Sequence, residues 1–398
     1  MKHASKILAL LAGLVSQAAS AERVYAPTLQ LRAEERYDDD YRLNPNPGGS
    51  GQMMTKLTPR LGLEMKAPTQ KLDSFYAADF LLRHGTNTFS VDHRAGLDTR
   101  TELSRRLRLD ATAKVFRVTD PTSLPRVGLG RSFAPILYGR GGLGLTGRAS
   151  DRVDLRTGYV FEAARLYNQE LTPERTVRPV SYVHMPSLEA WYRTTRRLSL
   201  GAEYRYQAFL LGPALDQSHG AFAAVRVRLT PLVTLGVRGG PMQFLGRDGT
   251  SGLLPRASVE LAREGQRLDL ALLLGHDLVG ASGSTEPSLW ADFASAVFSR
   301  QFARRFKLYG AASYFRNGRP PSRGLFGSDA AGPVSAGYAV GGGLEYQLSR
   351  KVSFQASADR IAQLGATGAA GETGAAGSLE LPSATRNVAA VRAVVMAF

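Results

Sequence analysis

The chain has 398 residues, with 50 Lys or Arg against 34 Asp or Glu, and a formal net charge of +16. The absence of Cys excludes a disulfide framework and thiolate metal sites. The basic excess does not indicate nucleic-acid binding, because the arginines alternate with apolar residues instead of forming a block or a helix face. No segment beyond the N-terminal region has the continuous apolar run of a transmembrane helix.

The N-terminal segment has the pattern of a secretory signal peptide. Lys2 and Lys6 precede an apolar run over residues 7–15, and small residues follow at Ala19 and Ala21. The alternative is a membrane anchor, but the apolar run is too short to span a bilayer as a helix. The sequence therefore predicts cleavage after Ala21.

The rest of the chain alternates apolar and polar residues with a period of two. Leu57, Leu61 and Leu63, for example, alternate with Arg60 and Glu64. This period places the two sets on opposite faces of a strand. The segments run for about ten to thirteen residues, which suits a tilted membrane strand better than the shorter strands of a soluble sandwich.

Short polar turns separate these segments and allow the strands to be counted. Eight turns are expected near residues 67–71, 104–106, 149–151, 194–197, 230–232, 263–266, 303–305 and 348–351. With an opening strand at 24–37 and a closing strand at 385–398, the total is about 18. Longer connections are expected at 120–135, 317–335 and 365–384. The prediction is an all-β protein: a single antiparallel up-and-down transmembrane barrel without a plug, formed by residues 22–398 after a signal peptide at 1–21.

The C-terminal end resembles the closing strand of a Gram-negative outer-membrane barrel. Val394, Met396 and Phe398 are interpreted as one lipid-facing stripe and as the assembly signal, with Arg392 interrupting the stripe. The closing strand should then pair with the first strand. This interpretation places the protein in the outer membrane, with both termini in the periplasm. It also implies contact with lipid, lipopolysaccharide and the barrel assembly machinery.

The residue types needed for chemistry are sparse. The histidines do not stand at metal-ligand spacing, and no Gly-x-Ser-x-Gly elbow is present, so neither an enzyme, a metal nor a cofactor is expected. The run from Asp38 to Asp40 is interpreted as a solvated external turn. A divalent-cation site among lipopolysaccharide phosphates is the alternative for that run.

The water-facing positions of the strands carry the candidate functional residues. Arginines exceed the interleaved acids there, which favours an Arg-lined aqueous lumen that attracts anions. Ion-pair ladders that stiffen the wall are the structural alternative. The candidate pore-lining residues are Arg60, Arg94, Arg108, Arg140, Arg156, Arg205, Arg226, Arg228, Arg238, Glu64, Asp110, Glu162 and Glu203.

The segment from Leu29 to Asp40, a strand ending in Tyr37-Asp38-Asp39, resembles the first hairpin of barrels encoded beside exopolysaccharide genes. The repeated turn-Arg-apolar-polar-apolar pattern and the single-domain length are also similar to this group of myxobacterial-type secretion porins. The resemblance implies export of an anionic polysaccharide through a wide channel, with a periplasmic export protein as partner.

Two other functions stay open at this point. The first is a passive diffusion porin for small anions or sugars, and the second is a structural barrel of an envelope-spanning complex. A diffusion porin usually folds a long loop into its lumen, and no such loop is evident in mid-chain. That absence favours the export channel among the three.

Overall fold

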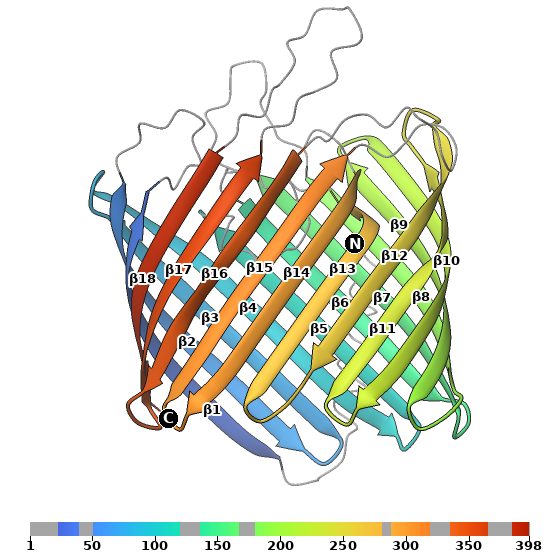
Figure 1. Cartoon of the computed structure of the whole chain (residues 1–398), viewed down its shortest axis with the longest axis horizontal. Helices are drawn as coiled ribbons and strands as arrows, with labels where there is room; N and C mark the ends of the chain where they lie inside the picture. The colour runs from blue at the N-terminus through green and yellow to red at the C-terminus, as the bar shows by residue number, and fades with distance from the viewer. Residues whose placement is uncertain are drawn as a thin grey trace, which may run out of the picture.

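The computed structural model describes residues 23–39, 51–119, 136–166, 180–280, 288–318, 335–364 and 384–397. They form 18 antiparallel strands in one closed sheet, in which each strand pairs with its sequence neighbours and β1 also pairs with β18 (Figure 1). The predicted all-β barrel of about 18 strands, with its last strand joined to its first, is therefore confirmed. The described part contains no helix, and so no plug domain and no helix that could cross a membrane. The predicted signal peptide at 1–21 lies outside the described residues.

The strands are long and similar in length. Their bounds are β1 Val24–Asp38, β2 Gln52–Ala67, β3 Gln70–Arg83, β4 Thr88–Ser104, β5 Leu107–Val118, β6 Ile136–Arg148, β7 Val153–Leu166, β8 Ser181–Arg193, β9 Leu198–Leu211, β10 Ala214–Thr230, β11 Val233–Leu245, β12 Ser251–Arg263, β13 Leu268–Gly280, β14 Ser288–Ala303, β15 Phe306–Gly318, β16 Ser335–Gln347, β17 Val352–Leu364 and β18 Ala384–Met396. They run from 12 to 17 residues, enough for a tilted strand to cross a bilayer.

The two ends of the barrel differ. All eight predicted short turns are confirmed and lie at one end, here called the turn end. The opposite end, called the loop end, carries the connections predicted at 120–135, 317–335 and 365–384, which fall almost wholly outside the described residues. One loop-end connection, between β9 and β10, has only two residues, and Gly212 there has φ 59°, a conformation that favours glycine.

The outer face of the wall is apolar. Leu57, Leu61 and Leu63 point outward with exposed fractions of 42%, 58% and 39%. Their cross-strand partners on β3 include Phe80, opposite Leu57, and Tyr76, opposite Leu61. Because opposite residues share a face, this pairing extends the apolar surface around the barrel, as a lipid-facing wall requires.

The orientation expected for the closing strand is wrong. Val394 is buried and lies opposite Arg32, on the same face as Arg392, whose Nε contacts Glu34 at 2.7 Å. Arg392 therefore marks the inner face and does not interrupt a lipid-facing stripe. Val394 and Met396 belong to the inner series, whereas Val391, Ala393 and Val395 form the outer one. Phe398 lies outside the described residues.

Candidate functional site: a narrowed, arginine-rich lumen

The wall opens at the loop end between β12 and β13. Their ladder runs only from Arg263 opposite Leu270 to Ala257 opposite His276, although β13 continues to Gly280 and β12 begins at Ser251. Figure 1 shows the two strands diverging toward the loop end. The last residues of β13, from Asp277 to Gly280, are called the β13 tip below.

The β13 tip packs against the inner wall. Leu278 is only 1% exposed and belongs to a cluster with Val183, Phe209, Phe222, Met242, Phe244 and Leu254, all on the inner faces of β8 to β12. Leu274 lies four residues earlier, in the same alternating series of β13, yet it points outward and is 53% exposed. A Cβ at Gly280 would lie 2.6 Å from Val183 Cγ2, so the backbone approaches the wall closely there. The tip has therefore left the wall and entered the lumen.

Polar contacts hold the tip in this position. The carboxylate of Asp277 forms an ion pair with Arg256, whose Nε lies 2.8 Å away, and lies 3.8 Å from Arg205 Nη1. Gln207 Nε2 donates to the backbone oxygen of Leu278 at 3.4 Å. At the start of β14, Ser288 Oγ donates to Asp216 at 2.6 Å. The sequence predicted no long mid-chain loop that folds inward, and this strand end, which does fold inward, was not predicted.

A charged layer lies on the turn-end side of the tip. Glu203 is 4% exposed, and its carboxylate contacts Arg205 at 2.5 Å, Arg238 at 2.7 Å and Arg256 at 3.6 Å. Three guanidinium groups thus surround one buried carboxylate. Because Arg205 and Arg256 also contact Asp277, the layer couples the wall to the tip.

Further toward the turn end, a cleft of about 380 Å³ opens on the lumen side of β5 to β11. Its charged lining comprises seven arginines and two carboxylates: Arg108, Arg156, Arg193, Arg196, Arg197, Arg226, Arg228, Asp154 and Glu189. The two acids are engaged, since Arg193 contacts Asp154 at 3.0 Å and Trp191 Nε1 donates to Glu189 at 3.0 Å. This arginine cleft therefore carries a large surplus of positive charge.

Five guanidinium groups in the arginine cleft face water without a carboxylate partner among the described residues. Arg196 and Arg197 belong to the turn between β8 and β9, and the other three lie on strands. Arg156, Arg226 and Arg228 are exposed, and no acid lies within ion-pair distance of them in that part of the chain. Arg226 stacks on the indole of Trp191, with its Cζ 4.5 Å from the ring centroid. A stacked guanidinium keeps its in-plane N–H groups free to bind a carboxylate or phosphate.

The opposite wall is arranged differently. Glu34 lies between Arg32 at 3.0 Å and Arg392 at 2.7 Å. Asp79 contacts Lys56 at 3.1 Å and Arg94 at 2.7 Å. Each of these buried acids is paired with two cations, so this side holds ion-pair ladders, as the structural alternative expected.

The candidate pore-lining residues all fall on the inner face, but they do not form one site. Arg205, Arg238 and Glu203 belong to the charged layer, and Arg108, Arg156, Arg226 and Arg228 to the arginine cleft. The remainder are distributed over other strands: Arg60 over Phe75, Arg94 with Asp79, Arg140 with Glu162, Asp110 with Arg100 and Arg108, and Glu64 with Lys66.

Sequence reasoning missed the residues that narrow the lumen. Phe209 follows Glu203, Arg205 and Gln207 on one side of β9, and Phe244 follows Arg238 on one side of β11. A large apolar residue at an inward-facing position, after several polar residues on the same side of the strand, indicates that other residues cover the inner wall at that position. No comparable signal distinguishes Leu278, which continues the outward series of Leu270 to Leu274.

The run from Asp38 to Asp40 was interpreted as a solvated external turn, and this interpretation is wrong for Asp38. Asp38 is the last residue of β1, is 0% exposed and pairs with Arg386 and Arg36. Asp39 accepts hydrogen bonds from the backbone and side-chain nitrogens of Asn387. The position of Asp40 lies outside the described residues. Among the described residues no three His, Asp or Glu side chains cluster closely enough to hold a metal ion.

The fold and the lumen define a closed transmembrane β-barrel with a narrowed, cation-rich interior. No protein-family model and no curated protein sequence matches the chain. Among solved structures it is similar to Pseudomonas aeruginosa OpdL, at 12% identity and a TM-score of 0.45, with 94% of this chain and 99% of that chain covered. It is also similar to Pseudomonas aeruginosa OccK2 (OpdF) in complex with glucuronate, at 13% identity and a TM-score of 0.44, covering 94% and 98%. A third is an anion-selective porin from Comamonas acidovorans, at 9% identity and a TM-score of 0.39, covering 94% and 100%.

Proposed function

We propose that the protein is a passive diffusion channel of a Gram-negative outer membrane that prefers small anions. The observation that carries this proposal is the arginine cleft beside the narrowed section, with the unpaired guanidinium groups of Arg156, Arg226 and Arg228. A surplus of fixed positive charge raises the local concentration of anions and lowers that of cations. A barrel of 18 strands is wide enough for an aqueous channel, so passage needs neither a cofactor nor an energy source.

The narrowed section favours small solutes over a polymer. The sequence favoured polysaccharide export partly because no long loop was expected to fold into the lumen, which indicated a wide or a gated channel. The β13 tip and its contacts with Arg256 and Gln207 occupy part of the lumen, so a polymer would have to pass this section as well. Export with a periplasmic partner and an anchoring role are therefore the two alternatives that a deletion strain would distinguish from a diffusion channel.

Ion selectivity in planar bilayers tests the proposal. The reversal potential of the purified barrel is measured across a KCl gradient, for the wild type and for the triple variant Arg156→Gln, Arg226→Gln, Arg228→Gln. The wild type should prefer chloride, and the triple variant should lose several-fold in the anion-to-cation permeability ratio. The matched control removes the same charge from exposed turn-end arginines, through Arg304→Gln, Arg305→Gln and Arg350→Gln, and should change the ratio little. Cation preference in the wild type, or an unchanged ratio in the triple variant, would contradict the proposal.

A deletion strain separates the channel from the other functions. Slower growth on a small anionic nutrient, with surface polymers intact, is the expected phenotype. Loss of one surface polysaccharide with normal uptake would indicate export instead. Normal uptake and normal polymers, with a defect in an envelope machine, would indicate an anchoring role.

A further inference from the structure

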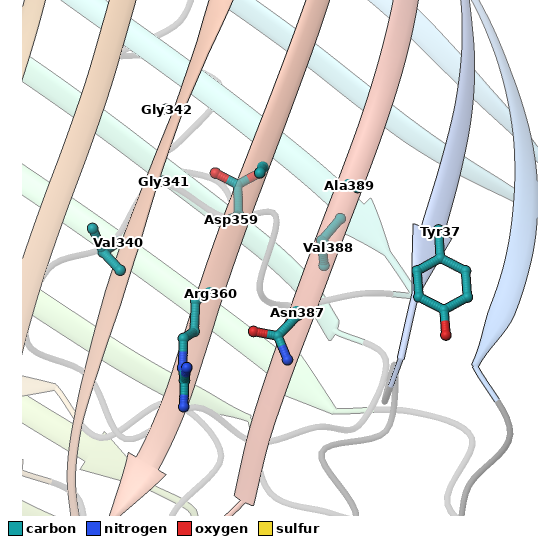
Figure 2. Close-up of a pocket in the computed structure, with 10 residues that line it drawn as sticks. Tyr37, Val340, Gly341, Gly342, Asp359, Arg360, Asn387, Val388 and Ala389 are labelled. Carbon is teal, nitrogen blue, oxygen red and sulfur yellow. The ribbon is translucent and has the colours of Figure 1, made fainter.

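A groove of about 440 Å³ runs along the outer wall where β16, β17, β18 and β1 lie side by side (Figure 2). Its floor consists of Gly342, Ala358 and Ala389, which are cross-strand neighbours in one register row. Val340 and Tyr37 flank it, with exposed fractions of 49% and 46%. The groove is thus apolar, open to the surroundings of the barrel, and hollow because its floor residues have almost no side chain.

Polar side chains lie at the loop-end side of the groove. Arg360 and Asn387 are opposite each other in the next register row, and both point outward. In Figure 2, Arg360 extends away from the groove floor, and the amide of Asn387 lies on the next strand beside it. Arg360 is exposed, and no carboxylate lies within ion-pair distance of it among the described residues. The neighbouring acid, Asp39, is held by Asn387 through hydrogen bonds of 2.6 and 2.5 Å.

Outward-facing tyrosines fix the level of this guanidinium in the membrane. Tyr338 and Tyr314 face each other in the register row just beyond Arg360 toward the loop end. Tyr37 lies in the row just below it, opposite Ala389. Aromatic girdles of membrane barrels mark the boundary between hydrocarbon and headgroups. Arg360 therefore lies at headgroup level, and the groove floor extends from there into the hydrocarbon.

We propose that this groove binds a membrane lipid that carries a phosphate headgroup. One acyl chain lies on Gly342, Ala358 and Ala389, between Val340 and Tyr37, and the phosphate oxygens accept hydrogen bonds from Arg360. The guanidinium matches phosphate geometry bidentately, and its charge complements the anionic headgroup. The apolar floor requires the chain as well as the phosphate, so the site takes an amphiphile and not a free ion. This lipid site lies outside the lumen and is independent of the channel function.

Native mass spectrometry of the full barrel in a zwitterionic detergent tests the site. The probe is dimyristoyl phosphatidic acid, compared with dimyristoylglycerol, which lacks the phosphate, and with inorganic phosphate, which lacks the chains. The variants are Arg360→Gln, which removes the charge, and Ala358→Phe, which fills the groove. The control is Arg300→Gln, an exposed outward arginine near the turn end. Heat-modifiable gel migration verifies that each variant is folded.

The wild type and the control should bind phosphatidic acid alike. Arg360→Gln should weaken binding roughly tenfold or more, as expected for a hydrogen bond to a charged group. Ala358→Phe should weaken it comparably, and the two partial probes should bind at least about tenfold more weakly than phosphatidic acid. Equal binding by all variants would overturn the proposal. So would a dimer that Ala358→Phe abolishes, because the groove would then be an interface between two copies of the chain.

Discussion

The carboxylate of Asp38 and the guanidinium of Arg386 form a fully buried ion pair across the seam where β1 meets β18. Both side chains are 0% exposed, and Arg386 Nε donates to the two carboxylate oxygens at 2.9 and 3.1 Å. Arg36 adds a second cation at 2.7 Å. The residues are 348 positions apart, so the barrel is closed by side chains at its loop end in addition to the backbone ladder.

Breaking this pair should weaken the barrel strongly. Arg386→Gln leaves a buried carboxylate without its main partner, and we expect a loss of about 3–5 kcal/mol in the free energy of unfolding. The measurement is the urea midpoint of the heat-modifiable gel band. Lys66→Gln is the control, because the Lys66–Glu64 pair is solvent-exposed and water screens it, so its loss should change the midpoint little. Equal midpoints for the two variants would show that the seam does not depend on this pair.

The β13 tip should control the conductance. Leu278→Ala removes a fully buried side chain from the inner-wall cluster, at a packing cost of about 2–5 kcal/mol, and should loosen the tip. The expected result is a higher single-channel conductance with more current noise. Leu274→Ala, on the same strand but facing lipid, should leave the conductance unchanged. A Leu278→Ala channel identical to the wild type would mean that the tip does not limit ion flow.

Trp191 should position Arg226 for anion binding. Its ring lies under Arg226 at 4.5 Å and near Arg238 at 5.9 Å. Trp191→Leu removes a stacking contact of about 0.5–2 kcal/mol, so the dissociation constant for channel block by inorganic pyrophosphate should rise roughly two- to thirtyfold. Trp191→Phe keeps an aromatic face and should have a smaller effect. If Trp191→Leu left the block by pyrophosphate unchanged, anion binding would not depend on the stacking of Arg226 on Trp191.

The register of the closing strand can be tested by labelling, because the chain has no native Cys. Val391 is 62% exposed on the outer face, whereas Arg392 contacts Glu34 on the inner face. A membrane-impermeant thiol reagent should therefore modify Arg392→Cys and not Val391→Cys. A lipid-soluble reagent should show the reverse preference. The opposite pattern would restore the lipid-facing stripe expected from the sequence.

The wall of the barrel could be predicted from the sequence because its determinants are local. Each turn is encoded by a few consecutive polar residues, such as Ser349-Arg350-Lys351, and each face by a period of two. The predicted orientation of the closing strand was wrong because the inner face of this strand is mostly apolar, with Val388 and Val394 on the same side as Arg392. Only the contact with Glu34, from the other end of the chain, shows which side that arginine marks.

The candidate site was predictable in composition and not in arrangement. Alternation alone places Arg226 and Arg228 on the inner face, but whether an arginine is paired depends on strands far away in sequence. Arg238, for example, is paired with Glu203 from two strands away, 35 positions earlier. The inward path of the β13 tip has no local signature either, since Leu278 continues an outward series. It depends on an apolar surface assembled from five other strands.

The divergence of β12 and β13 also sets a limit on how the protein sits in its bilayer. Beyond Ala257 and His276 the ladder between these strands ends, although both continue toward the loop end. Among the described residues, backbone amide and carbonyl groups along the β13-facing edge of Ser251 to Arg256 thereby have no partner on β13, and hydrocarbon cannot satisfy such groups. Water must therefore reach the opening between β12 and β13 at the loop end. On this side of the molecule the hydrocarbon core of the bilayer therefore does not extend beyond the level of Ala257 and His276 toward the loop end. The β13 tip enters the lumen on the loop-end side of that level.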